Sequence, residues 1–195
     1  MSVRYGHNVS DDSELNLLHD LAGKKVLVVG VDSVDDNGLP NSVSAALDGA
    51  NVVAVDPQLD RLHTVRAAAE RAETHVQCKQ VELADLGFAT SATFDMAMAI
   101  HSLDRCDDVP RLLRQVHRVL KPNAPFIVAV AHPIATMFDA DGAARQRYGA
   151  QGTFADLYMT FERANFHFDM VHELMSGRGA VAPSVLVVRA RKIGT

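Results

Sequence analysis

Residues 94–133 read FDMAMAIHSLDRCDDVPRLLRQVHRVLKPNAPFIVAVAHP and predict a strand, a helix and a second strand in succession. Residues 94–100 and 126–131 are almost wholly apolar, which is typical of parallel strands covered by helices on both faces. Between them apolar residues recur at helical spacing, and KPNAP ends the helix because Pro does not continue it. The apolar helix positions are Val109, Leu112, Leu113, Val116, Val119 and Leu120.

The same alternation of strands and helices extends along the rest of the chain. Alternation at this spacing predicts a doubly wound, mostly parallel α/β sheet with right-handed crossovers, in a single domain over residues 1–195. We expect residues 1–22 to form a helical lead-in and residues 133–152 a long connection. Further strands are expected at 24–30, 51–56, 75–81, 166–174 and 184–190, and further helices at 11–21, 41–47, 57–73 and around Phe154–Phe161.

The composition narrows the partners of this domain. With a formal net charge of -5 over 195 residues, the chain lacks the clustered Lys and Arg that nucleic acids and anionic membranes require. No apolar run reaches the ~18 residues of a membrane helix, and the first residues do not read as a signal peptide. Cys78 and Cys106 stand apart and the histidines form no HxxxH pattern, so we expect reduced thiols, no metal and a cytoplasmic location. Small molecules or proteins are the expected partners, and a homodimer stays open.

The carboxyl ends of the predicted strands indicate where a ligand would bind. Ligands of open α/β sheets lie beyond these ends, which here are the loop after Gly30, Asp56, residues 82–85 and residues 100–104. A carboxylate at Asp56 can accept the hydroxyl protons of a ribose. Alternatively, Asp56 caps the helix that follows at Pro57.

Several of these segments resemble class I S-adenosylmethionine (SAM) dependent methyltransferases, in the branch that acts on small molecules. The 94–133 block resembles that family's passage from the fourth to the fifth strand, which ends in RVLKPGG and an apolar strand. ANVVAVDPQ, VELADLGF and the final VLVVRARK resemble its second strand, its adenine-binding stretch and its last strand. The resemblance extends from about residue 20 to residue 192.

The resemblance implies a Rossmann-like methyltransferase fold with seven strands, one of them antiparallel. It implies a cofactor site in which Asp56 with Pro57 holds the ribose of SAM, and Glu82 and Leu83 meet the adenine. The resemblance also implies that Ile100 and His101 line the SAM site. Beside the methionine part of SAM it places Gly30, Val31 and Asp32.

The first motif departs from the family pattern VLELGCGxGxNS. Val28 stands in the place of its acid, and the glycines after Gly30 are replaced in a longer loop that contains Asp32, Asp35 and Asp36. These carboxylates would repel the pyrophosphate of a dinucleotide, which disfavours an NAD(P) oxidoreductase. They are less hostile to SAM, which carries a sulfonium and an ammonium. Asp32 either replaces the missing acid or is a solvated loop residue.

Two histidines are candidates for a general base. His101 and His132 follow the fourth and fifth strands, where a neutral imidazole could take a proton from a hydroxyl. In most proteins, however, a histidine at such a position is a packing or hydrogen-bonding residue. The sequence therefore predicts a methyltransferase that uses SAM, returns S-adenosylhomocysteine (SAH) and acts on an unidentified small molecule. The alternative is a methyltransferase-like protein with weakened or lost SAM binding that serves as a binding or scaffold module.

Overall fold

The computed structural model describes residues 2–31, 39–139, 142–177 and 179–194, which form a seven-stranded sheet in the order β3-β2-β1-β4-β5-β7-β6. Strand β7 runs antiparallel to both of its neighbours, and the other strands are parallel to one another. This confirms the predicted fold. The strands are β1 Lys25–Val29, β2 Asn51–Asp56, β3 Val76–Gln80, β4 Met96–Ile100, β5 Pro125–Ala131, β6 Phe166–Leu174 and β7 Val185–Lys192.

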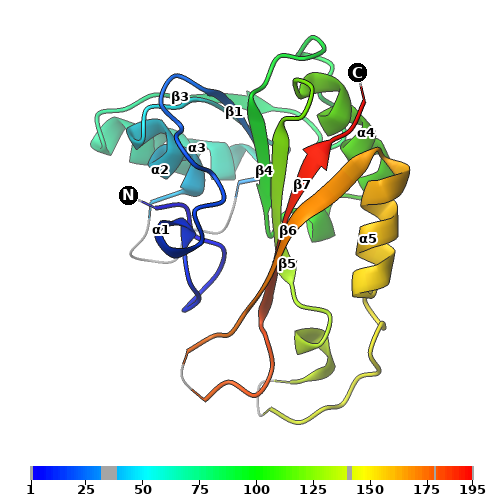
Figure 1. Cartoon of the computed structure of the whole chain (residues 1–195). Coiled ribbons are helices and arrows are strands. Elements are labelled where there is room, and N and C mark those ends of the chain that lie inside the picture. The colour runs from blue at the N-terminus through cyan, green and yellow to red at the C-terminus, as the bar shows by residue number, and fades with distance from the viewer. Residues whose placement is uncertain (1, 32–38, 140–141, 178, 195) are drawn as a thin grey trace.

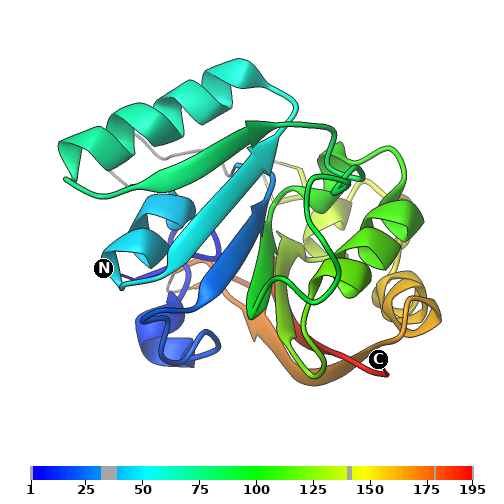
Figure 2. The same ribbon diagram turned by 90° about the horizontal axis from the view of Figure 1, so that it is seen from above.

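Helices cover both faces of the sheet. In Figure 2, α2 and α3 lie on one face, and α4 and α5 lie on the other. Each face has its own apolar core, and successive residues of β1 alternate between them: Val26 joins one core and Leu27 the other. The unbroken apolar runs of the sequence follow from this double burial. The helices are α1 Asp12–Leu15, α2 Asn41–Leu47, α3 Leu59–Arg71, α4 Val109–Val119 and α5 Phe154–Arg163, with short 3-10 turns η1 Leu103–Arg105 and η2 Ala135–Met137.

The expected helix over 11–21 is wrong beyond its first turn. Asp11 caps the start of α1, but α1 ends at Leu15 and Asn16 adopts a positive φ of 50°. The Asp12 carboxylate accepts the N–H groups of Leu17 and Leu18, which directs these residues out of the helix. Both leucines are still buried, so the apolar pattern predicted their burial and not their conformation.

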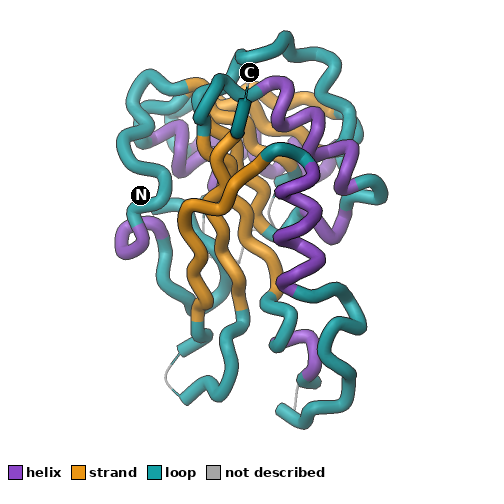
Figure 3. Tube along the Cα trace, turned by 45° about the vertical axis from the view of Figure 1, so that its right-hand side comes forward, coloured by secondary structure: helices purple, strands orange, loops and turns teal. Residues whose placement is uncertain are grey.

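The carboxyl ends of the parallel strands lie at the lower edge of the sheet in Figure 1. Beyond that edge extend the connection after β5 and the turn between β6 and β7, which Figure 3 shows from another side. Among the described residues, no helix has the length and apolar character needed to cross a membrane.

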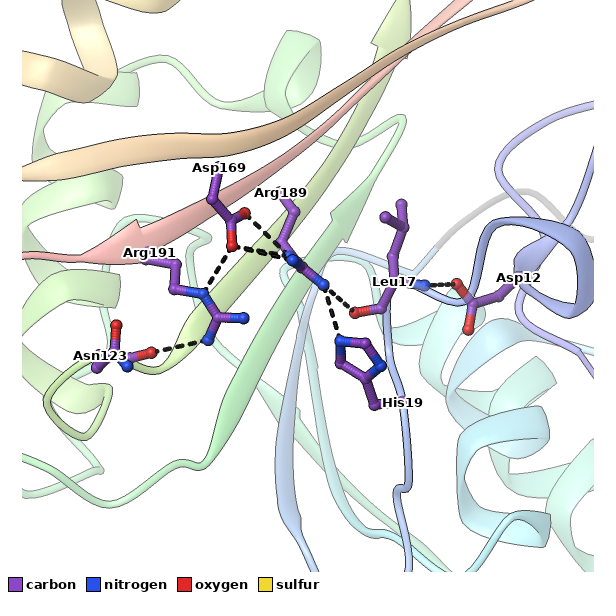
Figure 4. A network of polar contacts seen from close by, with 7 residues as sticks. All are labelled: Asp12, Leu17, His19, Asn123, Asp169, Arg189 and Arg191. Atoms are coloured by element: carbon purple, nitrogen blue, oxygen red, sulfur yellow. Dashed lines mark hydrogen bonds and ion pairs between the residues drawn. The ribbon is translucent and has the colours of Figure 1, made fainter.

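A buried arginine ties the N-terminal segment to the sheet (Figure 4). Arg189 on β7 donates through Nη2 to Asp169 on β6 at 3.0 Å, and through Nη1 to the Leu17 carbonyl at 3.4 Å and to His19 Nε2 at 2.9 Å. Arg191 donates to the same carboxylate at 2.7 Å. Burial raises the pKa of Asp169, but the hydrogen bonds and charges of the two arginines outweigh it and hold this pKa below its ordinary value.

Replacing Asp169 should destabilise the protein in a pH-dependent way. Because its folded pKa is depressed, the carboxylate stabilises the fold above the unfolded pKa of about 3.9 and loses this effect as pH falls through the folded value. We expect Asp169→Asn to lower the free energy of unfolding by about 1–3 kcal/mol at pH 7, and by less at pH 3.5. Urea unfolding at both pH values measures the two free energies, and Glu70→Gln at an exposed position of α3 is the control. A loss of the same size at both pH values would contradict the assignment.

Candidate functional site

Asp56 is the last residue of β2 and has no solvent exposure. Its Oδ2 accepts the N–H of Val31 at 2.9 Å, and its Oδ1 accepts the N–H of Gln58 at 2.9 Å. The first contact holds the loop after β1, and the second orients the chain just before α3. The carboxylate therefore joins two segments at the edge where the sequence predicted a ligand.

A third donor to Asp56 comes from the loop after β4. Arg105, at the end of η1, donates through Nη1 to Asp56 Oδ2 at 3.0 Å and through Nη2 to the Val31 carbonyl at 3.0 Å. Its Nε is buried and has no hydrogen-bond partner in the described structure. Arg105 is not among the site residues that the sequence predicts. The available signal was a basic residue following β4 at the same edge as a buried acid.

Gly30 lies where the loop after β1 packs against the loop after β4. Its φ is +75°, and its N–H is donated to the Val55 carbonyl at 2.8 Å. A Cβ at this position would lie 2.4 Å from the Cβ of Ser102 and 2.7 Å from Nη2 of Arg105. Ser102 is itself fixed, because its hydroxyl donates to the Val29 carbonyl at 2.6 Å. Only glycine fits between these groups.

Gly30→Ala should be more destabilising than Gly23→Ala. Gly23 has a similar φ of +72° but nothing within 4 Å of its Cβ position, so it shows the backbone cost alone. We expect about 1–2 kcal/mol for Gly23→Ala, and a further 1–3 kcal/mol for Gly30→Ala from the contact with Ser102 and Arg105. Chemical denaturation of both variants gives the difference. Equal losses would show that the two loops move apart at little cost.

His101 is held by the N-terminal segment. Its Nε2 lies 2.8 Å from the Tyr5 carbonyl, and because a carbonyl only accepts, Nε2 carries the proton. In the neutral ring the Nδ1 is then left to accept. His101 also has a positive φ of 48° and follows Ile100, which is buried in the core.

His132 is engaged at both ring nitrogens. Its Nδ1 accepts the N–H of Ile134 at 3.1 Å, and its Nε2 lies 2.9 Å from the Glu173 carboxylate. The side chain is buried, and these contacts join the end of β5 to β6. His132 therefore links the end of β5 to β6 through both ring nitrogens, whereas His101 is hydrogen-bonded through Nε2 and its Nδ1 can accept a hydrogen bond from a ligand.

The remaining predicted site residues differ in how exposed they are to solvent. Leu83 is buried in the core that also contains Val55, and Glu82 is exposed. Burial raises the pKa of the nearby Cys106 thiol, and the charges of Asp108, Asp107 and Glu82 raise it further, so this thiol is a poor nucleophile at neutral pH. Pro57 is half-buried, and its carbonyl accepts from the Gln80 side chain at 3.2 Å. Asp32, Asp35 and Asp36 lie outside the described residues.

A cavity of about 420 Å³ opens beside His101. It lies between the ends of β4 and β5, the start of α4, the connection after β5 and α5. Leu103, Val109, Val130 and Leu157 make its walls largely apolar. Asp104 and Asp156 are its charged lining residues, and no Lys or Arg lines it among the residues that the structure describes. Asp156 also closes the capping box of α5 with Thr153. No cluster of His, Cys, Asp and Glu in the described part of the chain could hold a metal ion.

Comparison with known proteins shows what this chain is similar to. Residues 38–128 match the family described as a methyltransferase domain. A SAM-dependent methyltransferase from Mesorhizobium loti has the same fold, with a TM-score of 0.71 and 21% identity over 92% of this chain and 96% of that one. Residues 38–128 therefore resemble that family, and the chain as a whole has the fold of this SAM-dependent methyltransferase.

Two further structures show how widely this fold is used. The 1,6-didemethyltoxoflavin-N1-methyltransferase of Burkholderia thailandensis, solved with its substrate and SAH, has a TM-score of 0.60 and 21% identity over 94% of this chain and 75% of that one. The cyclase SpnF has a TM-score of 0.70 and 17% identity over 94% of this chain and 81% of that one. No curated protein sequence matches the chain.

Proposed function

We propose that the protein is a methyltransferase that transfers the methyl group of SAM to a small molecule and returns SAH. The supporting observation is the position of Asp56, a buried carboxylate at the end of β2 in contact with the loop after β1. This is where the family resemblance predicts the acid that holds the ribose. The chain works as one domain, with residues 1–22 as a lead-in and 133–152 covering the acceptor.

The residues at this edge fit the cofactor on one condition. A buried carboxylate needs hydrogen-bond donors, and ribose hydroxyls are donors as the N–H groups of Arg105 are. Asp56 is therefore suited to a ribose once Arg105 has left it. With Asp56 and Pro57 on the ribose, Glu82 and Leu83 would meet the adenine, and Gly30, Val31, Ile100 and His101 would line the rest. Asp32 stays a prediction of the sequence.

The chain's own residues position the acceptor and manage its proton. Bound SAM supplies an electrophilic methyl group, and transfer depends on holding the acceptor atom in line with it. The cavity beside His101 holds the acceptor, and the Tyr5 carbonyl fixes the tautomer that leaves Nδ1 as the base for a hydroxyl acceptor. His101 is thus a stronger candidate than His132, whose nitrogens are both engaged.

The lining of the cavity favours a neutral or amine-bearing acceptor. Its charged residues are Asp104 and Asp156, so an anionic acceptor would meet repulsion from two carboxylates. Matched pairs of one ring system, such as phenethylamine and phenylacetate, test this through release of SAH from SAM. We expect turnover only among the amines and neutral compounds. Turnover confined to the carboxylates would refute this acceptor class.

The second candidate function is a binding or scaffold module without strong SAM binding. The ion pair between Arg105 and Asp56 favours it, because that pair already satisfies the acid that the cofactor needs. The likeness to SpnF, called a cyclase, is compatible with functions of this fold other than methyl transfer.

Binding of SAH separates the two functions. At SAH about 100 times above its dissociation constant, binding to the folded state adds roughly 2.7 kcal/mol of stability, which raises the melting temperature by several degrees. Asp56→Ala should abolish this shift, whereas Asp60→Ala on the exposed start of α3 should keep it. Circular dichroism verifies the fold of both variants. No shift of the native protein at millimolar SAH, confirmed by calorimetry, would exclude the methyltransferase function.

A further inference from the structure

We propose that Arg105 is an internal competitor of the cofactor for Asp56. Its guanidinium occupies the donor position on Oδ2 that a ribose hydroxyl would take, so the site opens only when Arg105 leaves. This inference rests on the proposed function, because it concerns the same cofactor site. Arg105 thereby controls the affinity of that site for SAM and SAH.

The contacts of Asp56 show why the two would compete for Oδ2, which already accepts two hydrogen bonds. The carboxylate is wholly buried, and its oxygens already receive the N–H groups of Val31 and Gln58 and the Nη1 of Arg105. The N–H groups of Val31 and Gln58 are part of the main chain and cannot rotate away from Asp56 as a side chain can. Arg105 is the side-chain donor among them, and its side chain is 22% exposed, so it borders on solvent.

The position of Arg105 over Gly30 adds a steric argument. Its Nη2 lies 2.7 Å from where a Cβ of Gly30 would be, and the same Nη2 donates to the Val31 carbonyl at 3.0 Å. The guanidinium therefore covers the part of the backbone after β1 against which the family resemblance places the cofactor. Arg105 thus blocks the acid, and it shares the adjacent Val31 carbonyl with Arg61, whose Nη1 donates to it at 2.9 Å.

One nitrogen of Arg105 lacks a hydrogen bond within the described part of the chain. Its Nε has no hydrogen-bond partner, although it is buried. A buried donor without an acceptor costs free energy, which lowers the cost of moving the side chain into solvent. The closed arrangement is thus favoured by the ion pair and weakened by the unpaired Nε.

Competition of this kind reduces affinity by a definite rule. When only a fraction of molecules is competent to bind, the apparent dissociation constant rises by the inverse of that fraction. An arrangement with Arg105 on Asp56 in about nine molecules of ten would weaken binding about tenfold. Removing the guanidinium should recover that factor.

A purely structural role for Arg105 predicts a different result. If the residue only neutralises a buried acid, its loss lowers stability and leaves SAH affinity unchanged or weaker. Affinity for SAH, measured beside stability, therefore distinguishes the two roles.

The test measures SAH binding by isothermal calorimetry in the native chain, Arg105→Gln, Arg105→Lys and the control Arg111→Gln. Arg111 lies on the exposed side of α4, so the control removes the same charge away from the site. We expect Arg105→Gln to bind SAH about tenfold more tightly or better, and Arg111→Gln to match the native chain. Arg105→Lys keeps a cation beside Asp56 but lacks the planar guanidinium that also reaches Val31, so its affinity for SAH should lie between those of the native chain and Arg105→Gln. It also provides a second variant to measure if Arg105→Gln does not fold.

Each outcome separates the inference from the proposed function. Tighter SAH binding by Arg105→Gln than by the native chain supports the competition. If Arg105→Gln binds SAH and the native chain does not, the ion pair between Arg105 and Asp56 also prevents the native chain from using SAM as a cofactor. Binding by the native chain with no gain in either Arg105 variant overturns the competition and leaves the methyltransferase function intact. No binding by any of the proteins overturns both.

Discussion

The carboxylate of Asp56 is the constraint on which this end of the molecule depends. A carboxylate without access to water must be satisfied by donors of the protein, and three segments supply them: the loop after β1, the entry to α3 and the loop after β4. Meeting this demand draws the loops after β1 and β4 together until only a glycine fits at position 30. One buried charge thus sets the geometry of the edge where ligands of this fold class bind.

The same requirement connects stability with function. An acid that needs donors can be satisfied by its own protein or by a ligand, and the two solutions exclude each other at the oxygen that Arg105 occupies. Under the proposed competition, the ion pair stabilises the protein and lowers the affinity of the site for a cofactor, a trade-off between stability and activity known from other active sites. The neighbouring cavity beside His101 is lined by Leu103 and Asp104 of the same turn, η1, that ends at Arg105.

The N-terminal segment is part of the site's frame. Tyr5 is buried, its hydroxyl donates to Asp12 at 2.5 Å, and its carbonyl fixes the His101 ring. Arg189 anchors the following residues to the sheet. A segment that the sequence indicated only as a helical lead-in therefore orients the candidate base through backbone contacts.

By itself the sequence determined the sheet, its helical layers and the position of Asp56, because these depend on local apolar periodicity and on the rule that ligands gather at strand ends. The strand over 51–56 was predicted to the residue. The helix over 11–21 was not, because buried leucines make the same pattern whether or not the side chain of Asp12 takes the backbone N–H groups after them. The pairing of Asp56 with Arg105 follows from the assembled fold alone, since the two residues lie 49 positions apart and meet only once β1, β2 and β4 are assembled. Periodicity describes each element alone, whereas a buried charge is satisfied by whichever donors the folded sheet brings within reach.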